Sequence, residues 1–372
     1  MPGELIVSGT LICGDQLEVS DGYVVVRDGK IREVVVDPAG SNDRGVERVA
    51  AGVTGLVCPA FVNAHTHVGD AIAKDPPYLP LDELVKPPDG LKHRLLRAAS
   101  PYVVAAGVRS ALADMAATGT GYFADFREGG AAGAQLLRGL AGGRATVLGR
   151  AGEGEAVEDV LRHADGLGFS GANDLPRDAL FAMAQKAKDS HKMVGIHAGE
   201  LNSSDIETAM ELAPDFLVHM THASGRDIAR ARDLGIPVVV CPRSNAACGV
   251  GAPPVRAMAE AGLLLGLGTD NVMINAPDMF AEMEWASKLF VRDDRRTLRM
   301  ATIDGARLLG LGDRKGTIEA GKDADLVVLD KSSNNLRCSQ NLLSSLVRRA
   351  RPDDITCCII GGKVWRNSSR KS

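Results

Sequence analysis

The chain has 372 residues, 45% of them hydrophobic, and a formal net charge of -4 at pH 7. This length allows a large barrel core plus a smaller domain, and the absence of a basic patch argues against a nucleic-acid partner. No apolar run is long enough to span a membrane, and residues 1–5 do not resemble a signal peptide. The seven cysteines are irregularly spaced, without a Cys-x-x-Cys pair, which disfavours a disulfide framework. We therefore expect a cytoplasmic globular protein.

Both ends of the chain carry short β-strand signals. The β-like runs are residues 4–7, 22–27, 30–36, 324–330 and 357–365. The dipeptide Asp28-Gly29 lies between two of these runs and is a strong signal for a hairpin turn. We predict a small composite β-sandwich domain that is assembled from residues 1–57 and 315–372.

The middle of the chain alternates apolar runs with Ala-rich amphipathic segments such as residues 179–190 and 227–234. The eight apolar runs are residues 61–67, 122–125, 145–149, 166–170, 193–196, 216–218, 237–240 and 263–267. Eight β/α units over this length are typical of a (β/α)8 TIM barrel, although an open doubly wound sheet would alternate in the same way. Polar residues end runs one, five, six and eight, and they converge only if the sheet closes. We therefore predict an α/β fold with a TIM barrel over residues 58–314.

Two histidines one residue apart, His65 and His67, close the first apolar run. Side chains alternate along a strand, so both histidines project to the same face and can share one metal ion. His197 ends the fifth run, and Asp270 follows the eighth. Three imidazoles and a carboxylate are suitable ligands for a catalytic zinc, iron or manganese ion that also binds a water molecule. Taken alone, Asp270 could instead be a helix N-cap.

Three residues are candidates for proton transfer. Asp270 would lie beside the metal-bound water and help to take its proton. Glu200 follows His197 by three residues and could protonate a ring nitrogen and then pass the proton to departing ammonia, whereas a solvated loop carboxylate is the alternative interpretation. His219 closes the sixth run and is predicted to orient the attacking hydroxide, while His222 is more simply a loop histidine.

Polar residues after strands one, seven and eight are candidate substrate contacts. They are Asp70, Lys74, Arg243, Asn245 and Asn271. Charges that face the barrel mouth should recognise a polar or anionic substituent, since a buried unpaired charge is unfavourable. Asp70 and Lys74 could instead form a surface helix pair, and residues 241–245 could be a turn with a structural Asn. The charged, Pro-rich segment 84–94 could be a lid over the barrel mouth.

Together these motifs resemble the amidohydrolase superfamily, in particular its branch of adenosine, cytosine and guanine deaminases and triazine chlorohydrolases. The matching segments are residues 63–67, 197–200, 219 and 268–270, with 315–326 near the end of the chain. The resemblance implies one divalent metal ion held by residues matching His65, His67, His197 and Asp270. It also implies that Glu200 is the proton shuttle and that His219 lies beside the water. A two-metal branch uses a carboxylated lysine after strand four, where residues 168–173 contain no lysine.

We therefore predict a metal-dependent aminohydrolase that deaminates an amino-substituted nitrogen heterocycle of the purine, pyrimidine or pterin type and releases ammonia. Hydrolysis of a cyclic amide or a carbon–halogen bond is the alternative. Glu200 favours deamination, because a ring nitrogen must be protonated in that reaction. A non-catalytic binding protein on this fold would have lost ligands, and here every ligand is present. The expected partner is a small heterocyclic substrate, without nucleic acid or membrane, and homo-oligomerisation is left open.

Overall fold

The computed structural model describes residues 4–37, 53–152 and 154–366. The chain divides into two compact units. One comprises Met1–Val62, Met115–Gly121 and Met279–Ser372, and the other comprises Asn63–Asp114 and Tyr122–Asp278. The domain boundaries near residues 57 and 314 stay a prediction. In the described residues, no helix has the length and apolar character to cross a membrane.

The second unit is built on a parallel sheet. Its strands are β5 (Phe61–His67), β6 (Thr120–Arg127), β7 (Ala145–Gly149), β8 (Gly166–Phe169), β9 (Met193–Ala198), β10 (Phe216–His219), β11 (Val238–Val240), β12 (Leu265–Leu267) and β13 (Asp270–Asn271). They pair in the order β12-β11-β10-β9-β8-β7-β6-β5-β13. Every residue of β5 and β6 is buried, as expected for parallel strands that are covered on both faces.

The two edges of this sheet belong to one segment of the chain. At one edge β12 pairs with β11, and at the other edge β13 pairs with β5, with Asp270 opposite Thr66. Only Gly268 and Thr269 separate β12 from β13. Residues 265–271 therefore act as a split eighth strand that closes the sheet. The predicted (β/α)8 TIM barrel is confirmed, and the open sheet is excluded.

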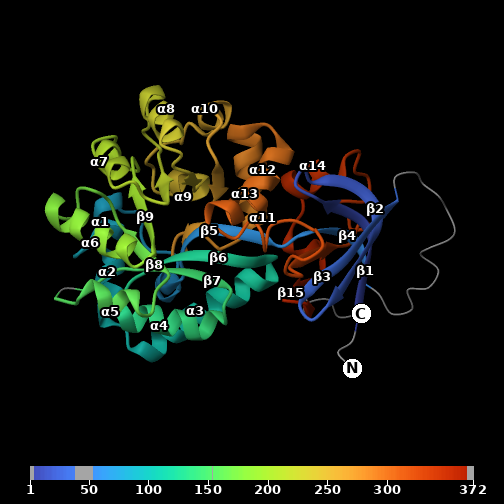
Figure 1. Cartoon of the computed structure of the whole chain (residues 1–372), viewed down its shortest axis with the longest axis horizontal. Coiled ribbons are helices and arrows are strands. Elements are labelled where there is room, and N and C mark those ends of the chain that lie inside the picture. The colour runs from blue at the N-terminus through green and yellow to red at the C-terminus, as the bar shows by residue number, and fades with distance from the viewer. Residues whose placement is uncertain (1–3, 38–52, 153, 367–372) are drawn as a thin grey trace. The chain divides into compact units, whose positions relative to one another are not determined.

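Helices alternate with the barrel strands, and Figure 1 shows them around the strands. They are α1 (Leu81–Val85), α2 (Leu91–Ala98), α3 (Pro101–Ala117), α4 (Gly130–Ala141), α5 (Val157–Leu161), α6 (Arg177–Asp189), α7 (Ile206–Glu211), α8 (Gly225–Asp233), α9 (Pro242–Ala247) and α10 (Val255–Glu260), with the 3-10 helix η2 (Val68–Ala73) after β5. The amphipathic segments 179–190 and 227–234 correspond to α6 and α8. Helix α8 begins at a capping box in which Ser224 and Asp227 satisfy each other's backbone N–H groups.

The first unit contains a mixed sheet formed by both ends of the chain. Its strands are β1 (Leu5–Cys13), β2 (Glu18–Arg27), β3 (Lys30–Asp37), β4 (Val53–Pro59), β14 (Leu326–Leu329), β15 (Ile355–Ile360) and β16 (Lys363–Arg366), in the order β16-β15-β14-β4-β1-β2-β3. Its helices are α11 (Met279–Trp285), η3 (Ala286–Val291), α12 (Asp294–Met300), α13 (Ile303–Leu308), α14 (Leu342–Arg348) and η4 (Pro352–Asp354). Asp28 and Gly29 both have positive φ and join β2 to β3 in an antiparallel hairpin, as predicted.

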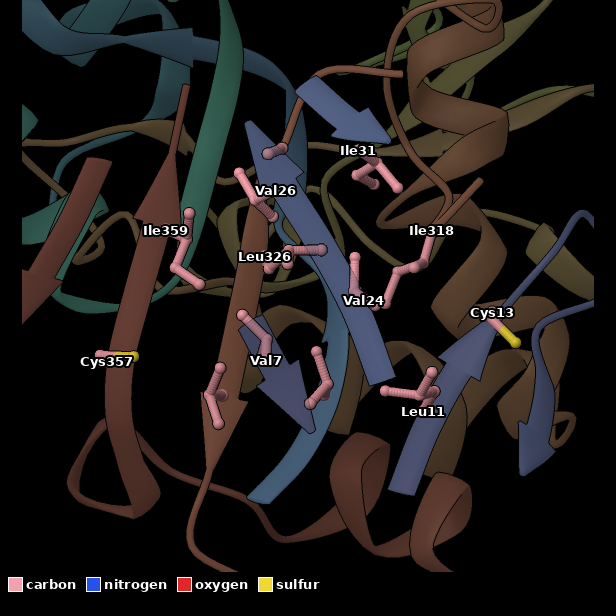
Figure 2. Close-up of a cluster of buried hydrophobic side chains, with 13 residues drawn as sticks. Val7, Leu11, Cys13, Val24, Val26, Ile31, Ile318, Leu326, Cys357 and Ile359 are labelled. Atoms are coloured by element: carbon pink, nitrogen blue, oxygen red, sulfur yellow. The ribbon is translucent and has the colours of Figure 1, made fainter. Parts of the chain in front are cut away.

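One apolar cluster fills the inside of this mixed sheet (Figure 2). It combines Ile31 of β3 with Ile359 of β15, although these strands lie far apart in the strand order. The sheet must therefore curve around the cluster. At β3 the Ile31 N–H donates to the Lys322 carbonyl over 2.9 Å, just before β14. The N- and C-terminal segments thus share one core, which matches the predicted composite β-domain.

Candidate active site

Four buried side chains from different barrel strands converge on one point. They are His65, His197, His219 and Asp270, and one ligand atom from each lies within 4.8 Å of the others. The His65 Nε2 atom is 3.2 Å from the Nε2 atom of His197 and 3.2 Å from the Oδ1 atom of Asp270. These four residues are far apart along the chain, and closure of the barrel brings them together.

His67 also faces this cluster. Its Nε2 atom is 3.5 Å from the Asp270 Oδ1 atom, and its ring is stacked on that of His197 with centroids 5.5 Å apart. All of the residues predicted as metal ligands are therefore adjacent. Their role as ligands stays a prediction.

Hydrogen bonds hold strand β5 against its neighbours. Asn63 and Thr269 bond reciprocally, with the Asn63 amide donating over 2.7 Å and the Thr269 N–H donating over 3.0 Å. On the other side, Asp125 accepts from the Thr66 hydroxyl over 2.9 Å and from the Val68 N–H over 2.6 Å. These buried polar contacts fix the strand from which His65 and His67 project.

Hydrogen bonds to neighbouring groups orient the side chains of the cluster, so that their other nitrogen or oxygen atoms are directed to the metal position. The His197 Nδ1 atom lies 2.8 Å from the Phe169 carbonyl, and the His67 Nδ1 atom lies 3.1 Å from the Phe126 carbonyl. A carbonyl can only accept, so the His197 Nδ1 atom carries the proton and its Nε2 atom has a lone pair. The His67 Nδ1 atom also lies 3.0 Å from the Lys92 ammonium. Ser244 donates to the Asp270 Oδ2 atom over 2.5 Å, which leaves Oδ1 toward the histidines. This donor set fits one divalent metal ion.

The charge states agree with this donor set. Burial and the nearby Lys92 lower the pKa of His67 to about 3, which keeps its imidazole neutral. Burial by itself raises the pKa of Asp270, but the hydrogen bond with His65 and the other histidines hold that pKa well below its usual range. Neutral imidazoles beside an ionised carboxylate are the forms that bind a metal ion.

The backbone is strained at two of the converging residues. His219 has φ of 77° and Asp270 has φ of 58°, in the left-handed region that side chains other than glycine rarely adopt. Such conformations cost roughly 1–3 kcal/mol each and persist where surrounding structure enforces them, which is typical of functional sites. At Asp270 the strain coincides with the break between β12 and β13.

Glu200 and His219 form the next layer of the site. The Glu200 Oε2 atom is 3.5 Å from the His219 Nε2 atom, and burial raises the pKa of Glu200 to about 7. The Asn245 amide nitrogen donates to the His219 Nδ1 atom over 3.1 Å. The Nδ1 atom of His219 therefore accepts this bond, which leaves Nε2 as the ring nitrogen that can donate.

A cavity of about 150 Å³ opens onto these residues, and all of its lining lies in the barrel unit. Glu200, His219 and Asn271 line it, together with Arg150. The segment from Leu81 to Pro87 supplies one wall, so part of the expected lid region does border the cavity. The site is thus a small cavity with a mixed polar and apolar lining beside the histidine cluster.

Four predicted substrate contacts are not among the residues that line this cavity: Asp70, Lys74, Arg243 and Asn245. Asp70 is buried 3.2 Å from Lys92, and Lys74 is 46% exposed and pairs with Asp114. Asp70 and Lys74 therefore do not form the surface pair of the alternative interpretation, and a role for either residue in substrate binding stays a prediction. Arg243 donates to the carbonyls of Ala276 and Asp278 over 2.8 and 3.3 Å, which hold the loop after β13.

Sequence reasoning missed two residues at the site, Lys92 and Glu128. Glu128 follows β6 directly, and a charged residue at the end of a barrel strand is the signal that could have identified it. Lys92 lies on α2 within a charged segment, where nothing in the local pattern distinguishes it from a solvated lysine.

The fold and this site agree with comparisons to known proteins. The model of the amidohydrolase family matches residues 56–365, and the chain belongs to this family. It is 34% identical to a putative aminohydrolase of Methanothermobacter thermautotrophicus, over 97% of this chain and 98% of that protein. It is 28% identical to a 5-methylthioadenosine/S-adenosylhomocysteine deaminase of Moorella thermoacetica, over 93% of this chain and 90% of that protein. The chain is accordingly a hydrolase.

Among solved structures, an adenosine deaminase of Xanthomonas campestris with bound zinc superposes with a TM-score of 0.81. The two chains are 24% identical, and the match covers 97% of this chain and 92% of the other. At this identity the match shows that the two proteins share a fold.

Proposed function

We propose that this protein is a metal-dependent aminohydrolase that deaminates an amino-substituted nitrogen heterocycle and releases ammonia. The observation that carries the proposal is Glu200, a largely buried carboxyl group 3.5 Å from His219 on the cavity wall beside the histidine cluster. Deamination needs such a group, because a ring nitrogen must gain a proton before ammonia can leave.

His65, His67, His197 and Asp270 would hold the metal ion, most simply zinc, with iron or manganese as alternatives. When bound, the ion supplies Lewis-acid chemistry and lowers the pKa of water. The Asp270 carboxylate, which accepts a hydrogen bond from Ser244, would also be the base that takes the proton of the attacking water. This assignment agrees with the neutral histidines and the ionised Asp270 described above.

Glu200 and His219 divide the remaining proton chemistry. Glu200 gives a proton to the ring nitrogen of the substrate, then takes the proton of the newly added hydroxyl group and passes it to the departing amine, and the proton held by Asp270 restores Glu200. The Nε2–H group of His219, held in place by Asn245, donates a hydrogen bond to the attacking oxygen and stabilises the charge that develops there. Asn271 lines the same cavity and is the remaining candidate for substrate contact.

The relatives support a heterocyclic substrate. The Moorella protein is named a 5-methylthioadenosine/S-adenosylhomocysteine deaminase, so purine nucleosides come first, followed by pyrimidines and pterins. Hydrolysis of a cyclic amide or a carbon–halogen bond is the alternative, and the names of the relatives favour deamination over it. A cytoplasmic location, the absence of a nucleic-acid partner and the oligomeric state stay predictions.

The experiment is a panel of amino-substituted heterocycles, with ammonia release measured by a coupled enzyme assay on protein of known metal content. We expect about one metal ion per chain and turnover of at least one purine, pyrimidine or pterin. The chlorinated and cyclic amide analogues belong in the same panel. Turnover of those analogues alone would replace deamination by the alternative.

A further inference from the structure

Four charged side chains are buried behind His67, outside the group that converges on the metal position. They are Asp70, Lys92, Arg127 and Glu128, which we call the buried charge cluster, and none is more than 6% exposed. They come from η2, α2, the end of β6 and the residue after it. Burying charges is unfavourable unless they are paired, so a cluster of this size calls for a function.

Lys92 is the centre of the cluster. Its Nζ atom is 2.6 Å from the Glu128 Oε1 atom and 3.2 Å from the Asp70 Oδ2 atom. It also lies 3.0 Å from the Nδ1 atom of His67. Glu128 itself approaches that same Nδ1 atom at 3.3 Å. The cluster therefore meets the metal-facing residues at one atom, the Nδ1 of His67.

The identity of the group that bonds to this atom determines which His67 nitrogen carries the proton. An ammonium group has no lone pair, so a bond from Lys92 to Nδ1 would put the proton on Nε2, toward Asp270. A carboxylate only accepts, so a bond to Glu128 keeps the proton on Nδ1 and leaves the Nε2 lone pair for a metal ion. The Lys92 Nζ atom is closer to the Glu128 Oε1 atom, at 2.6 Å, than to the His67 Nδ1 atom, at 3.0 Å, so the carboxylate competes with the imidazole for the ammonium.

His197 provides an internal comparison. Its Nδ1 atom meets the Phe169 carbonyl at 2.8 Å, and a carbonyl by itself sets the required tautomer. At His67 the corresponding distance, to the Phe126 carbonyl, is 3.1 Å, and a cation lies equally close. His67 therefore needs a second acceptor that His197 does not need.

We propose that Glu128 is a positioning residue that holds His67 with its Nε2 lone pair directed to the metal ion, and that Lys92 is the cation that keeps Glu128 buried as a carboxylate. This inference rests on the proposed metal-dependent function. Asp70 and Arg127 complete the charge balance around the pair. Helix α2 is thereby tied to the end of β6 through the Lys92–Glu128 pair.

The test is the affinity of the metal-free protein for Zn²⁺, measured by competition with a chromogenic chelator. Glu128→Gln keeps the size of the side chain and removes its charge. We expect binding about 10- to 100-fold weaker, the usual effect of losing a group that orients a metal-ligating histidine. The matched control is Glu158→Gln, which alters an exposed carboxylate 2.8 Å from Lys186 and should leave the affinity unchanged.

A second variant protects the test against misfolding, because Glu128→Gln leaves the buried Lys92 without its nearest partner. The double variant Lys92→Met/Glu128→Gln removes both charges together. It should fold and bind Zn²⁺ more tightly than Glu128→Gln does, because without the ammonium the Phe126 carbonyl alone sets the His67 tautomer, as at His197. A Glu128→Gln protein with an affinity within twofold of the wild type, or a double variant that binds Zn²⁺ no more tightly than Glu128→Gln, would overturn the inference. A wild-type protein that binds Zn²⁺ but releases no ammonia would overturn only the proposed deamination.

Discussion

Asp70 and Lys74 lie four positions apart along the same short segment, yet they have opposite surroundings. Asp70 is 1% exposed and lies 3.2 Å from the buried Lys92. Lys74 is 46% exposed and pairs at 3.5 Å with the equally exposed Asp114. In water the second pair contributes little, whereas the first cannot be broken without leaving a charge in a low-dielectric interior. The expected effect of substituting a charged residue therefore depends on its burial and on its distance from the histidine cluster more than on its residue type.

Substitutions within the histidine cluster itself should have the largest effect on metal binding and turnover. His65→Ala and Asp270→Ala should each release the metal ion and reduce turnover to background, because each removes one donor. Metal analysis and ammonia release measure both outcomes. His222→Ala, at an exposed histidine near the site, is the control and should retain metal and activity. A fully active Asp270→Ala protein would contradict the ligand assignment.

Next comes Glu200, which borders the cluster without joining it. Glu200→Gln should keep the metal ion and lower kcat about 100- to 10,000-fold, the usual contribution of a general acid or base. Steady-state kinetics and metal analysis on the same preparation provide the measurement. Glu207→Gln, at an exposed carboxylate 2.7 Å from Arg230, should behave as wild type. Near-normal turnover by Glu200→Gln would rule out the proton-shuttle role.

Asp70 should make the free energy of unfolding depend on pH. Burial raises its pKa to about 7, against the opposing effect of Lys92, so the folded protein binds this proton more tightly than the unfolded chain does. The resulting stabilisation is fully present below about pH 4 and is lost as the pH rises through about 7. Relative to Asp70→Asn, the wild type should therefore lose unfolding free energy over this range. Urea denaturation at several pH values measures the difference, and parallel curves would refute the assignment.

The smallest effect is expected at Lys74. Lys74→Ala should change the unfolding free energy by less than about 1 kcal/mol, because exposed ion pairs contribute about 0–1 kcal/mol. Its kcat/KM should stay within twofold of the wild type, since Lys74 does not line the cavity. Urea denaturation and steady-state kinetics test both points. A large loss of kcat/KM would indicate that Lys74 contacts the substrate and would contradict the expectation that the effect of a substitution follows burial.

The sequence by itself determined the features that follow from local patterns. The histidines at 65 and 67 share a face because strand side chains alternate, and the hairpin at Asp28-Gly29 follows from the conformations that this dipeptide favours. Eight apolar runs predicted the barrel, and polar residues at their ends predicted which side chains would converge. Each of these inferences needed only residues that are close along the chain, or a closed sheet that brings strand ends together.

Only the tertiary structure decided which charged residues meet. Lys92 and Glu128 are 36 positions apart, and their contact depends on where α2 packs relative to the end of β6. The same packing buries Asp70 and leaves Lys74 in water, although the local pattern of the two residues suggested a simple helix pair. Long polar side chains reach partners through space rather than along the chain, and the free energy of a charge depends on how much water surrounds it. Neither quantity is encoded in local spacing, so the buried charge cluster became visible only in the folded chain.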